Sequence, residues 1–227
     1  MKSSVKKVLG LSVLWFSVWG FLILYLEPHG IDYVHNYVIT SLYFLLVIVY
    51  MTNAFKDEIG AYVDRFEPSD LLAMTLFAVF VSVVYYVTAA YAGHSPLFFL
   101  RDRIPDALKL DYRFLITKSF EIMFQQCFFM ISIYYLFDNN VSRIADMLLF
   151  GVYTMLIHVP ILFVPTSSGK ILFAVSFFAG VIFSYCITRS RRGFVWSYMI
   201  HFAFYVLLAV SFWTLGPAHP SVFLQGA

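Results

Sequence analysis

Charged residues are scarce in this sequence of 227 residues, where Asp, Glu, Lys and Arg together make up only 12%. Soluble domains usually contain about 25% charged and about 45–50% apolar residues, whereas 61% of this chain is hydrophobic. A soluble globule of this size could not bury so much apolar surface. The composition therefore argues against a soluble enzyme and a disordered chain, and a net charge of +2 gives no support for a nucleic-acid partner.

Cysteine is equally scarce, because only Cys127 and Cys186 are present and each lies inside an apolar run. We interpret both as small buried residues, which excludes a disulfide framework and a cysteine metal site. Aromatic residues are abundant instead, with 26 Phe and 16 Tyr. Such side chains favour bilayer interiors and interfacial belts, so the composition predicts an integral membrane protein whose solvent is the lipid bilayer.

Long apolar runs set the expected fold, because a membrane helix needs about 20 mostly apolar residues. Seven runs reach roughly that length: 8–26, 34–54, 70–93, 113–137, 142–164, 170–188 and 193–215. The first follows a basic segment like that of a signal peptide, but it is too long and has no small-residue cleavage site, so we expect a retained span. We predict an all-α polytopic membrane helix bundle of about seven transmembrane helices, forming a single integral membrane domain over 1–227.

The connections between these runs carry further predictions. Apolar and charged residues mix over 94–112, which suits a short interfacial helix lying on the membrane. The polar connection 53–70 is expected to contain a short amphipathic helix around 59–63. Residues 165–170 end like a phosphate-binding loop, but Val164 stands where the first glycine would be. We therefore interpret this segment as an interhelical turn.

Lysine and arginine in the connections predict the orientation. With a cytoplasmic N-terminus, nine fall inside: Lys2, Lys6, Lys7, Lys56, Arg65, Arg143, Arg189, Arg191 and Arg192. Five then fall outside: Arg101, Arg103, Lys109, Arg113 and Lys170. The balance predicts a multi-pass protein of the inner (plasma) membrane, with its N-terminus in the cytoplasm and its C-terminus outside.

Three ionisable residues stand out because they lie inside the predicted spans: Glu121, His158 and His201. Charge in mid-bilayer costs at least about 2.5–3.5 kcal/mol and usually marks a functional site. A carboxylate and an imidazole together could activate a water for attack on an amide. Two alternatives remain open: each residue only joins helices through a hydrogen bond, or the three bind a catalytic zinc ion, although no His-Glu-x-x-His helix is present.

The order of these residues resembles the CPBP family, the CAAX-protease and bacteriocin-processing membrane proteins. That family has a Glu-Glu-x-x-x-Arg motif on one helix, a Phe-x-x-x-His motif on the next and a His-x-x-x-Asn motif on a later one. The counterparts here are three segments: 120–125, 154–158 and 201–205. The local likeness is strongest over 178–189 and 193–201. The resemblance covers a core of about 113–210, which makes the spans within 1–93 accessory.

This resemblance implies a glutamic-type intramembrane endopeptidase without a cofactor. In that reading Glu121 and His158 activate water, while His201 and Tyr205 stabilise the oxyanion. Tyr205 lies at i+4 from His201 and so shares its helix face. A phenol can donate the hydrogen bond that the family's asparagine would supply.

The motifs depart from the family pattern at several positions. Only one Glu is present, Gln125 or Gln126 replaces Arg depending on the register, Thr154 replaces Phe, and Tyr205 replaces Asn. These changes motivate the alternative of a non-catalytic CPBP-type protein that binds a partner or acts as a scaffold. A proton-coupled transporter using Glu121 is a weaker third hypothesis, because inverted repeats and paired broken helices are not evident.

Three polar neighbours are expected to support Glu121. Gln125 lies at i+4 and is expected to hold the carboxylate in position, or Gln126 and Gln125 bond across to other spans. Lys118 at i−3 could form an ion pair with Glu121, but we favour the interpretation that its side chain extends to the membrane interface. The leading hypothesis is thus a peptidase that cleaves a peptide or a membrane-protein segment. Prenylated CAAX proteins, bacteriocin or signal-peptide precursors and sorting tails are the substrate classes that the resemblance offers.

Overall fold

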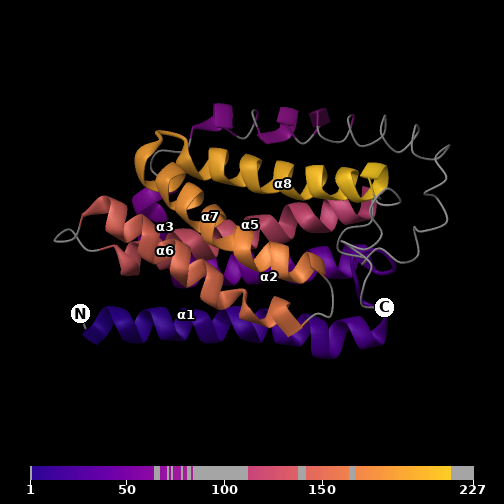
Figure 1. The fold of residues 1–227 in the computed structure, drawn as a ribbon, viewed down its shortest axis with the longest axis horizontal. Helices are drawn as coiled ribbons and strands as arrows, with labels where there is room; N and C mark the ends of the chain where they lie inside the picture. The colour runs from indigo at the N-terminus through magenta and orange to yellow at the C-terminus, as the bar shows by residue number, and fades with distance from the viewer. Residues whose placement is uncertain are drawn as a thin grey trace.

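The protein is described by a computed structural model covering residues 2–63, 67–70, 72, 74–77, 79–80, 83, 112–137, 142–163 and 167–215. Every regular element within these residues is a helix, which confirms the all-α class. Figure 1 shows long helices running along a common direction, with α7 crossing them obliquely. This arrangement is a helix bundle.

The N-terminal half of the described chain forms a bent first segment and a helical hairpin. Helix α1 spans Lys2–Phe21 and continues through a π-helical turn, η1 at Leu22–Leu26, and a 3-10 turn, η2 at Glu27–His29. Gly30 ends it with a φ of 74°, a left-handed conformation that glycine adopts without steric cost. Helix α2 spans Tyr37–Ala54, and the short helix α3 follows at Lys56–Val63. The expected helix around 59–63 is thereby confirmed.

The C-terminal half of the described chain contains four α-helices. Their bounds are α5 at Tyr112–Leu136, α6 at Arg143–Ile157, α7 at Ser167–Arg189 and α8 at Gly193–Leu215, with a 3-10 turn, η5, at Val159–Phe163. Ser142 caps α6, because its Oγ accepts a hydrogen bond from the amide of Ala145 at 3.2 Å. Pro160 follows α6 closely, and proline disfavours a helical conformation in the residue before it.

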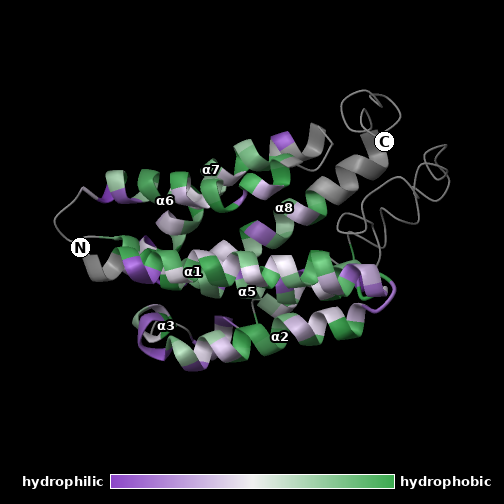
Figure 2. Ribbon diagram, turned by 90° about the horizontal axis from the view of Figure 1, so that it is seen from below, coloured by the Kyte–Doolittle hydropathy of each residue, from purple (hydrophilic) through white to green (hydrophobic). Residues whose placement is uncertain are grey.

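Four described segments are long and apolar enough to cross a membrane: Val5–His29, Tyr37–Ala54, Tyr112–Leu136 and Leu172–Arg189. Gly193–Leu207 is a shorter apolar helix. Figure 2 shows apolar residues over much of the helices and hydrophilic residues gathered near helix ends and connections. Large apolar side chains also cover the outside, for example Leu24, Val13 and Leu46. These features fit a multi-pass membrane protein whose outer surface contacts acyl chains.

The expected count of seven spans is matched only in part. Helix α6 has 15 residues, which is short for a span, although the run 142–164 was expected to cross the membrane. Most of the run 70–93, and all but the last residue of the segment 94–112 that is expected to form an interfacial helix, lie outside the described residues. The structure thus supports the all-helical class and four candidate membrane-spanning helices.

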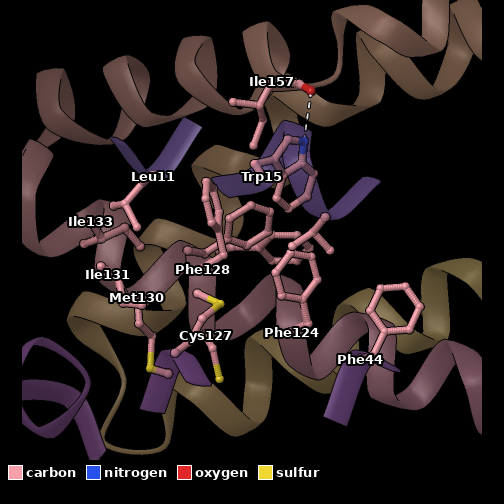
Figure 3. Packing of buried hydrophobic residues seen from close by; sticks show 14 of the residues in the cluster. Leu11, Trp15, Phe44, Phe124, Cys127, Phe128, Met130, Ile131, Ile133 and Ile157 are labelled. Atoms are coloured by element: carbon pink, nitrogen blue, oxygen red, sulfur yellow. Dashed lines mark hydrogen bonds between the residues drawn. The ribbon is translucent and has the colours of Figure 1, made fainter. Parts of the chain in front are cut away.

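Helix α5 lies at the centre of the bundle. Of its most apolar 18-residue window, 78% is buried, against 22% for Tyr37–Ala54. Trp15 of α1 and Phe44 of α2 both pack near Phe124 of α5, with ring centroids 5.7 and 5.9 Å away (Figure 3). The Trp15 indole N–H also donates to the Ile157 carbonyl at 3.1 Å, which ties α1 to the end of α6. The first two helices therefore share one core with the 113–210 segment.

Helices α6 and α7 approach each other closely at two glycines. A Cβ built on Gly180 would lie 2.5 Å from Thr154 Oγ1 and 3.0 Å from the Cα of Gly151. A Cβ on Gly151 would lie 2.9 Å from the Phe177 carbonyl oxygen. Small residues that let helix backbones touch are a common basis of helix packing in membranes. This contact positions the C-terminal end of α6, where Thr154 and His158 lie.

The turn between α7 and α8 is held by ion pairs with the segment 67–70. Arg192 Nε lies 2.7 Å from an oxygen of the buried Asp70, and its Nη2 donates to Glu67 at 3.2 Å. Arg191 also pairs with Glu67. The hydrogen bond from Arg192 and the nearby charge of Arg191 hold the pKa of the Glu67 carboxyl below its usual value. The basic turn after α7 is thus fastened to an acidic segment.

Acidification is expected to loosen this contact. Folding lowers the pKa of Glu67, so the ionised carboxylate stabilises the folded chain. This stabilisation is complete above the unfolded pKa of about 4.3 and is lost as the pH falls through the lower pKa of the folded chain. Hydrogen exchange of the Asp70 amide, corrected for the intrinsic pH dependence, should therefore accelerate in acid. Arg192→Gln should make exchange fast already at neutral pH, whereas Lys56→Gln, which removes a charge elsewhere, should not. Unchanged protection in Arg192→Gln would contradict the contact.

Candidate active site

Glu121 lies in the buried middle of α5, and three donors surround its carboxylate. Lys118 Nζ donates to Oε2 at 2.6 Å, and the Tyr33 hydroxyl donates to the same oxygen at 2.6 Å. Gln125 Nε2 donates to Oε1 at 2.7 Å. The expectation that Gln125 holds the carboxylate is thereby confirmed. Both oxygens of Glu121 are engaged, and no histidine is among these partners.

Lys118 forms the ion pair that the sequence left as an alternative. The favoured expectation, that its side chain extends to the interface, is wrong because the ammonium is buried with Glu121. The ammonium also lies 4.1 Å from the ring centroid of Tyr205 and 4.9 Å from that of Tyr33. A cation over an aromatic face is attracted by the ring electrons. Lys118 thus connects the carboxylate of α5 with the phenol of α8.

Tyr33 is a site residue that the sequence did not indicate. It lies in the connection between Gly30 and α2, which folds back over α5. Asp32 shapes this connection by accepting hydrogen bonds from the amides of Val34 and His35 at 2.8 and 2.7 Å. Partial burial raises the pKa of Asp32, but these two amides and the His35 ring outweigh it, so the pKa lies below its usual value. This turn leaves Tyr33 buried against Glu121.

His158 follows the last residue of α6 and caps its end. Its Nδ1 lies 2.7 Å from the Thr154 carbonyl oxygen, which can only accept a hydrogen bond. Nδ1 therefore carries the hydrogen of the neutral ring, and Nε2 is left as an acceptor. The ring packs against Trp15, with centroids 5.5 Å apart. The helix end thus fixes an imidazole whose free nitrogen can accept a proton.

His201 in α8 has the opposite arrangement. The Ser197 hydroxyl donates to Gln126 Oε1 at 2.7 Å, and with the amide in this orientation Gln126 Nε2 lies 3.0 Å from His201 Nδ1. An amide nitrogen donates, so Nδ1 accepts and Nε2 carries the ring hydrogen. The ring also stacks on Tyr205, with centroids 5.3 Å apart. The expected bond from Gln126 to another span and the shared face of His201 and Tyr205 are both confirmed.

A cavity of about 150 Å³ brings part of this set together. His158, just after the end of α6, and His201 and Tyr205 of α8 all line it. Its other walls come from α5, α6, η5, α7 and α8 and are almost entirely apolar. Glu121, Lys118 and Gln125 are not part of its lining. The two imidazoles and the phenol therefore face one cavity. The Glu121 carboxylate lies outside its lining and is hydrogen-bonded to Lys118, Tyr33 and Gln125.

The structure brings together only some of the expected site residues. The structure gathers His158, His201 and Tyr205 around one cavity but does not join Glu121 to either histidine by a hydrogen bond. Within the described residues, no group of three or more His, Cys, Asp or Glu side chains is arranged to hold a metal ion. The zinc alternative on Glu121, His158 and His201 is therefore not supported by this arrangement.

The chain matches no family model, no curated protein and no solved structure.

Proposed function

We propose that this chain is an intramembrane peptidase of the type its motifs resemble, and that the cavity lined by His158, His201 and Tyr205 is its active site. The observation that carries the proposal is the different pairing of the two imidazole Nδ1 atoms, that of His158 with a backbone carbonyl oxygen and that of His201 with the Gln126 side-chain amide. One ring offers an acceptor nitrogen and the other a donor nitrogen. Amide hydrolysis needs both, a base for the water and a donor for the carbonyl oxygen.

The proposed reaction uses these groups in turn. His158 Nε2 takes a proton from a water in the cavity as the water oxygen bonds to the carbonyl carbon of a substrate amide. His201 Nε2–H and the Tyr205 hydroxyl donate to the oxygen that gains negative charge. His158 then gives its proton to the departing nitrogen, so that the carbon–nitrogen bond breaks and a carboxylic acid and an amine remain.

Glu121 has a positioning role in this proposal. Its carboxylate fixes the Lys118 ammonium, which lies over the ring of Tyr205. A cation on that face draws electron density from the phenol and makes its hydroxyl a stronger donor. This differs from the expectation that Glu121 shares the water directly with His158, and it explains why a carboxylate with three donors belongs to the site.

Removal of His158, the proposed general base, should greatly slow cleavage. His158→Ala in proteoliposomes is expected to lower the cleavage rate of a fluorescent transmembrane-peptide library by about 10²–10⁴-fold, the usual contribution of a general base. The variant loses one hydrogen bond to Thr154 and the contact with Trp15, and it should remain folded. Tyr185→Ala, which changes an exposed residue of α7 outside the cavity, should cleave normally. Undiminished cleavage by His158→Ala would reject the proposal.

The second candidate is a non-catalytic protein that binds a membrane-protein partner. Its supporting observation is the complete engagement of the Glu121 carboxylate by Lys118, Tyr33 and Gln125. On this reading the motif residues join helices, and a partner should co-purify with the wild type and with Glu121→Gln without any cleaved product. Both candidates place the chain in the plasma membrane as one domain with about seven spans and a cytoplasmic N-terminus.

A further inference from the structure

Three polar side chains in the cavity wall have a hydrogen-bonding atom without a partner among the described residues: His158, His201 and Tyr205. Two other lining residues have hydroxyls, but both donate to backbone carbonyls: Thr154 to Phe150 at 2.8 Å and Ser176 to Phe173 at 2.6 Å. The remaining lining side chains are apolar: Phe129, Ile161, Leu172, Val175, Phe178, Ala179, Ile182, Phe183, Ile200 and Phe204. The side-chain donors that remain for a ligand are therefore those of His201 and Tyr205, and the ring of His158 adds an acceptor.

Three of the apolar lining residues also reach the outer surface. Phe178, Ile182 and Ile200 are 64%, 46% and 40% exposed, respectively. They lie on α7 and α8, the two helices that pack together beside the cavity. In a membrane protein, apolar side chains exposed on the outside of the spanning helices face acyl chains. The cavity is therefore bordered by the bilayer between α7 and α8.

Cavity volume limits what can bind. A cavity of about 150 Å³ is comparable to an engineered apolar cavity of that volume that takes up one benzene molecule. Pockets for drug-sized ligands are larger, about 300–1,000 Å³. A leucine or phenylalanine side chain fits the available space, whereas a farnesyl chain is too large to be enclosed in it.

We propose that the cavity binds one bulky apolar side chain, of leucine or phenylalanine size, from a non-prenylated membrane-embedded polypeptide that enters between α7 and α8. The end of a lipid acyl chain would meet the same apolar walls, but it would leave the acceptor of His158 and the donors of His201 and Tyr205 without partners. A peptide amide next to the bound side chain satisfies them. The inference rests on the proposed function, because that amide is the bond to be cleaved.

Photo-crosslinking tests this inference separately from cleavage. The probe is an alanine-rich fluorescent transmembrane peptide with one variable central residue: Ala, Leu, Phe or farnesylated Cys. The full chain carries a benzophenone amino acid in place of Phe178, in a His158→Gln background that prevents consumption of the peptide. Crosslinking to the Leu and Phe peptides should exceed that to the Ala and farnesyl peptides at least about tenfold, in line with the selectivity of an apolar pocket for methylene groups.

Two matched controls define the site. A benzophenone in place of Tyr185, which is 55% exposed on the same helix but does not line the cavity, should crosslink all four peptides alike. Ile182→Trp narrows the cavity mouth at an exposed position and should remove the preference for Leu and Phe, whereas Tyr185→Trp should keep it. Equal crosslinking from both positions, or a preference for the farnesyl peptide, would overturn the inference.

The two proposals fail in different ways. Cleavage by the wild type without any preference for the central residue would reject the side-chain site and leave the peptidase standing. Selective crosslinking at Phe178 in a protein that cleaves none of the peptides would support the side-chain site and reject the peptidase in favour of partner binding.

Discussion

Replacing Lys118 by methionine is expected to lower the free energy of unfolding by about 3–5 kcal/mol, the usual cost of removing one partner from a buried ion pair. Both side chains of the pair are buried, at 3% and 1% exposure. Lys118→Met leaves the Glu121 carboxylate with only the neutral donors Tyr33 and Gln125. Unfolding in mixed micelles with increasing SDS, followed by circular dichroism, measures the loss.

Two further variants test whether the loss of stability comes from leaving a buried charge without its partner. Replacing both partners, with Lys118→Met and Glu121→Leu, should cost less than the single change, because no unpaired charge remains. Arg191→Gln removes an ion pair with Glu67 whose arginine side chain is 81% exposed, and should cost less than about 1 kcal/mol. A Lys118→Met variant as stable as Arg191→Gln would show that the pair is not buried as described.

Gly180→Ala is expected to cost about 1–3 kcal/mol, because the added methyl has no room at the contact between α6 and α7. The nearest atoms belong to Thr154, a branched side chain that cannot turn away, and to the backbone of Gly151. Separation of the helices would also move the Thr154 carbonyl that holds His158. We therefore expect slower cleavage together with lower stability, measured by the same unfolding titration and peptide assay.

Gly20→Ala provides the control for this change. Nothing lies within 4 Å of a Cβ built on Gly20 in α1, so only helix propensity changes there. Alanine is favoured over glycine in a helix by about 1 kcal/mol, and this variant should be at least as stable as the wild type. Equal stability of Gly180→Ala and the wild type would show that α6 and α7 do not touch through these glycines.

Contacts along a single helix could be predicted from the sequence. Glu121 with Gln125 and His201 with Tyr205 are four residues apart, and helical geometry places such pairs on one face. The long apolar runs likewise predicted the helices that are long enough to span. These features depend on local periodicity, which a sequence contains directly.

Contacts between distant segments could not be predicted. The ion pair of Lys118 with Glu121 is a contact within α5 that the sequence leaves as an alternative, but the sequence does not show that Tyr205 of α8 covers the ammonium and keeps it from the interface. Tyr33 was missed because no local pattern says that its connection folds back over α5. His158 was expected inside a span, although Pro160 signals that α6 ends just before it. The separation of Glu121 from the two histidines follows from these tertiary contacts.

The central place of α5 has a consequence for biogenesis. Its hydropathy is the lowest of the four candidate spans, 1.2 against 2.0 for Val5–His29, and it carries the polar residues Lys118, Glu121, Gln125 and Gln126. A segment of this kind leaves the translocon for lipid only at considerable cost. Synthesis from the N-terminus releases α1 and α2 before α5 emerges, so that Tyr33 and the aromatic side chains of the first two helices are already present to receive it. The order of synthesis thus provides α5, the least apolar of the four candidate spans, with helices to pack against as it enters the membrane.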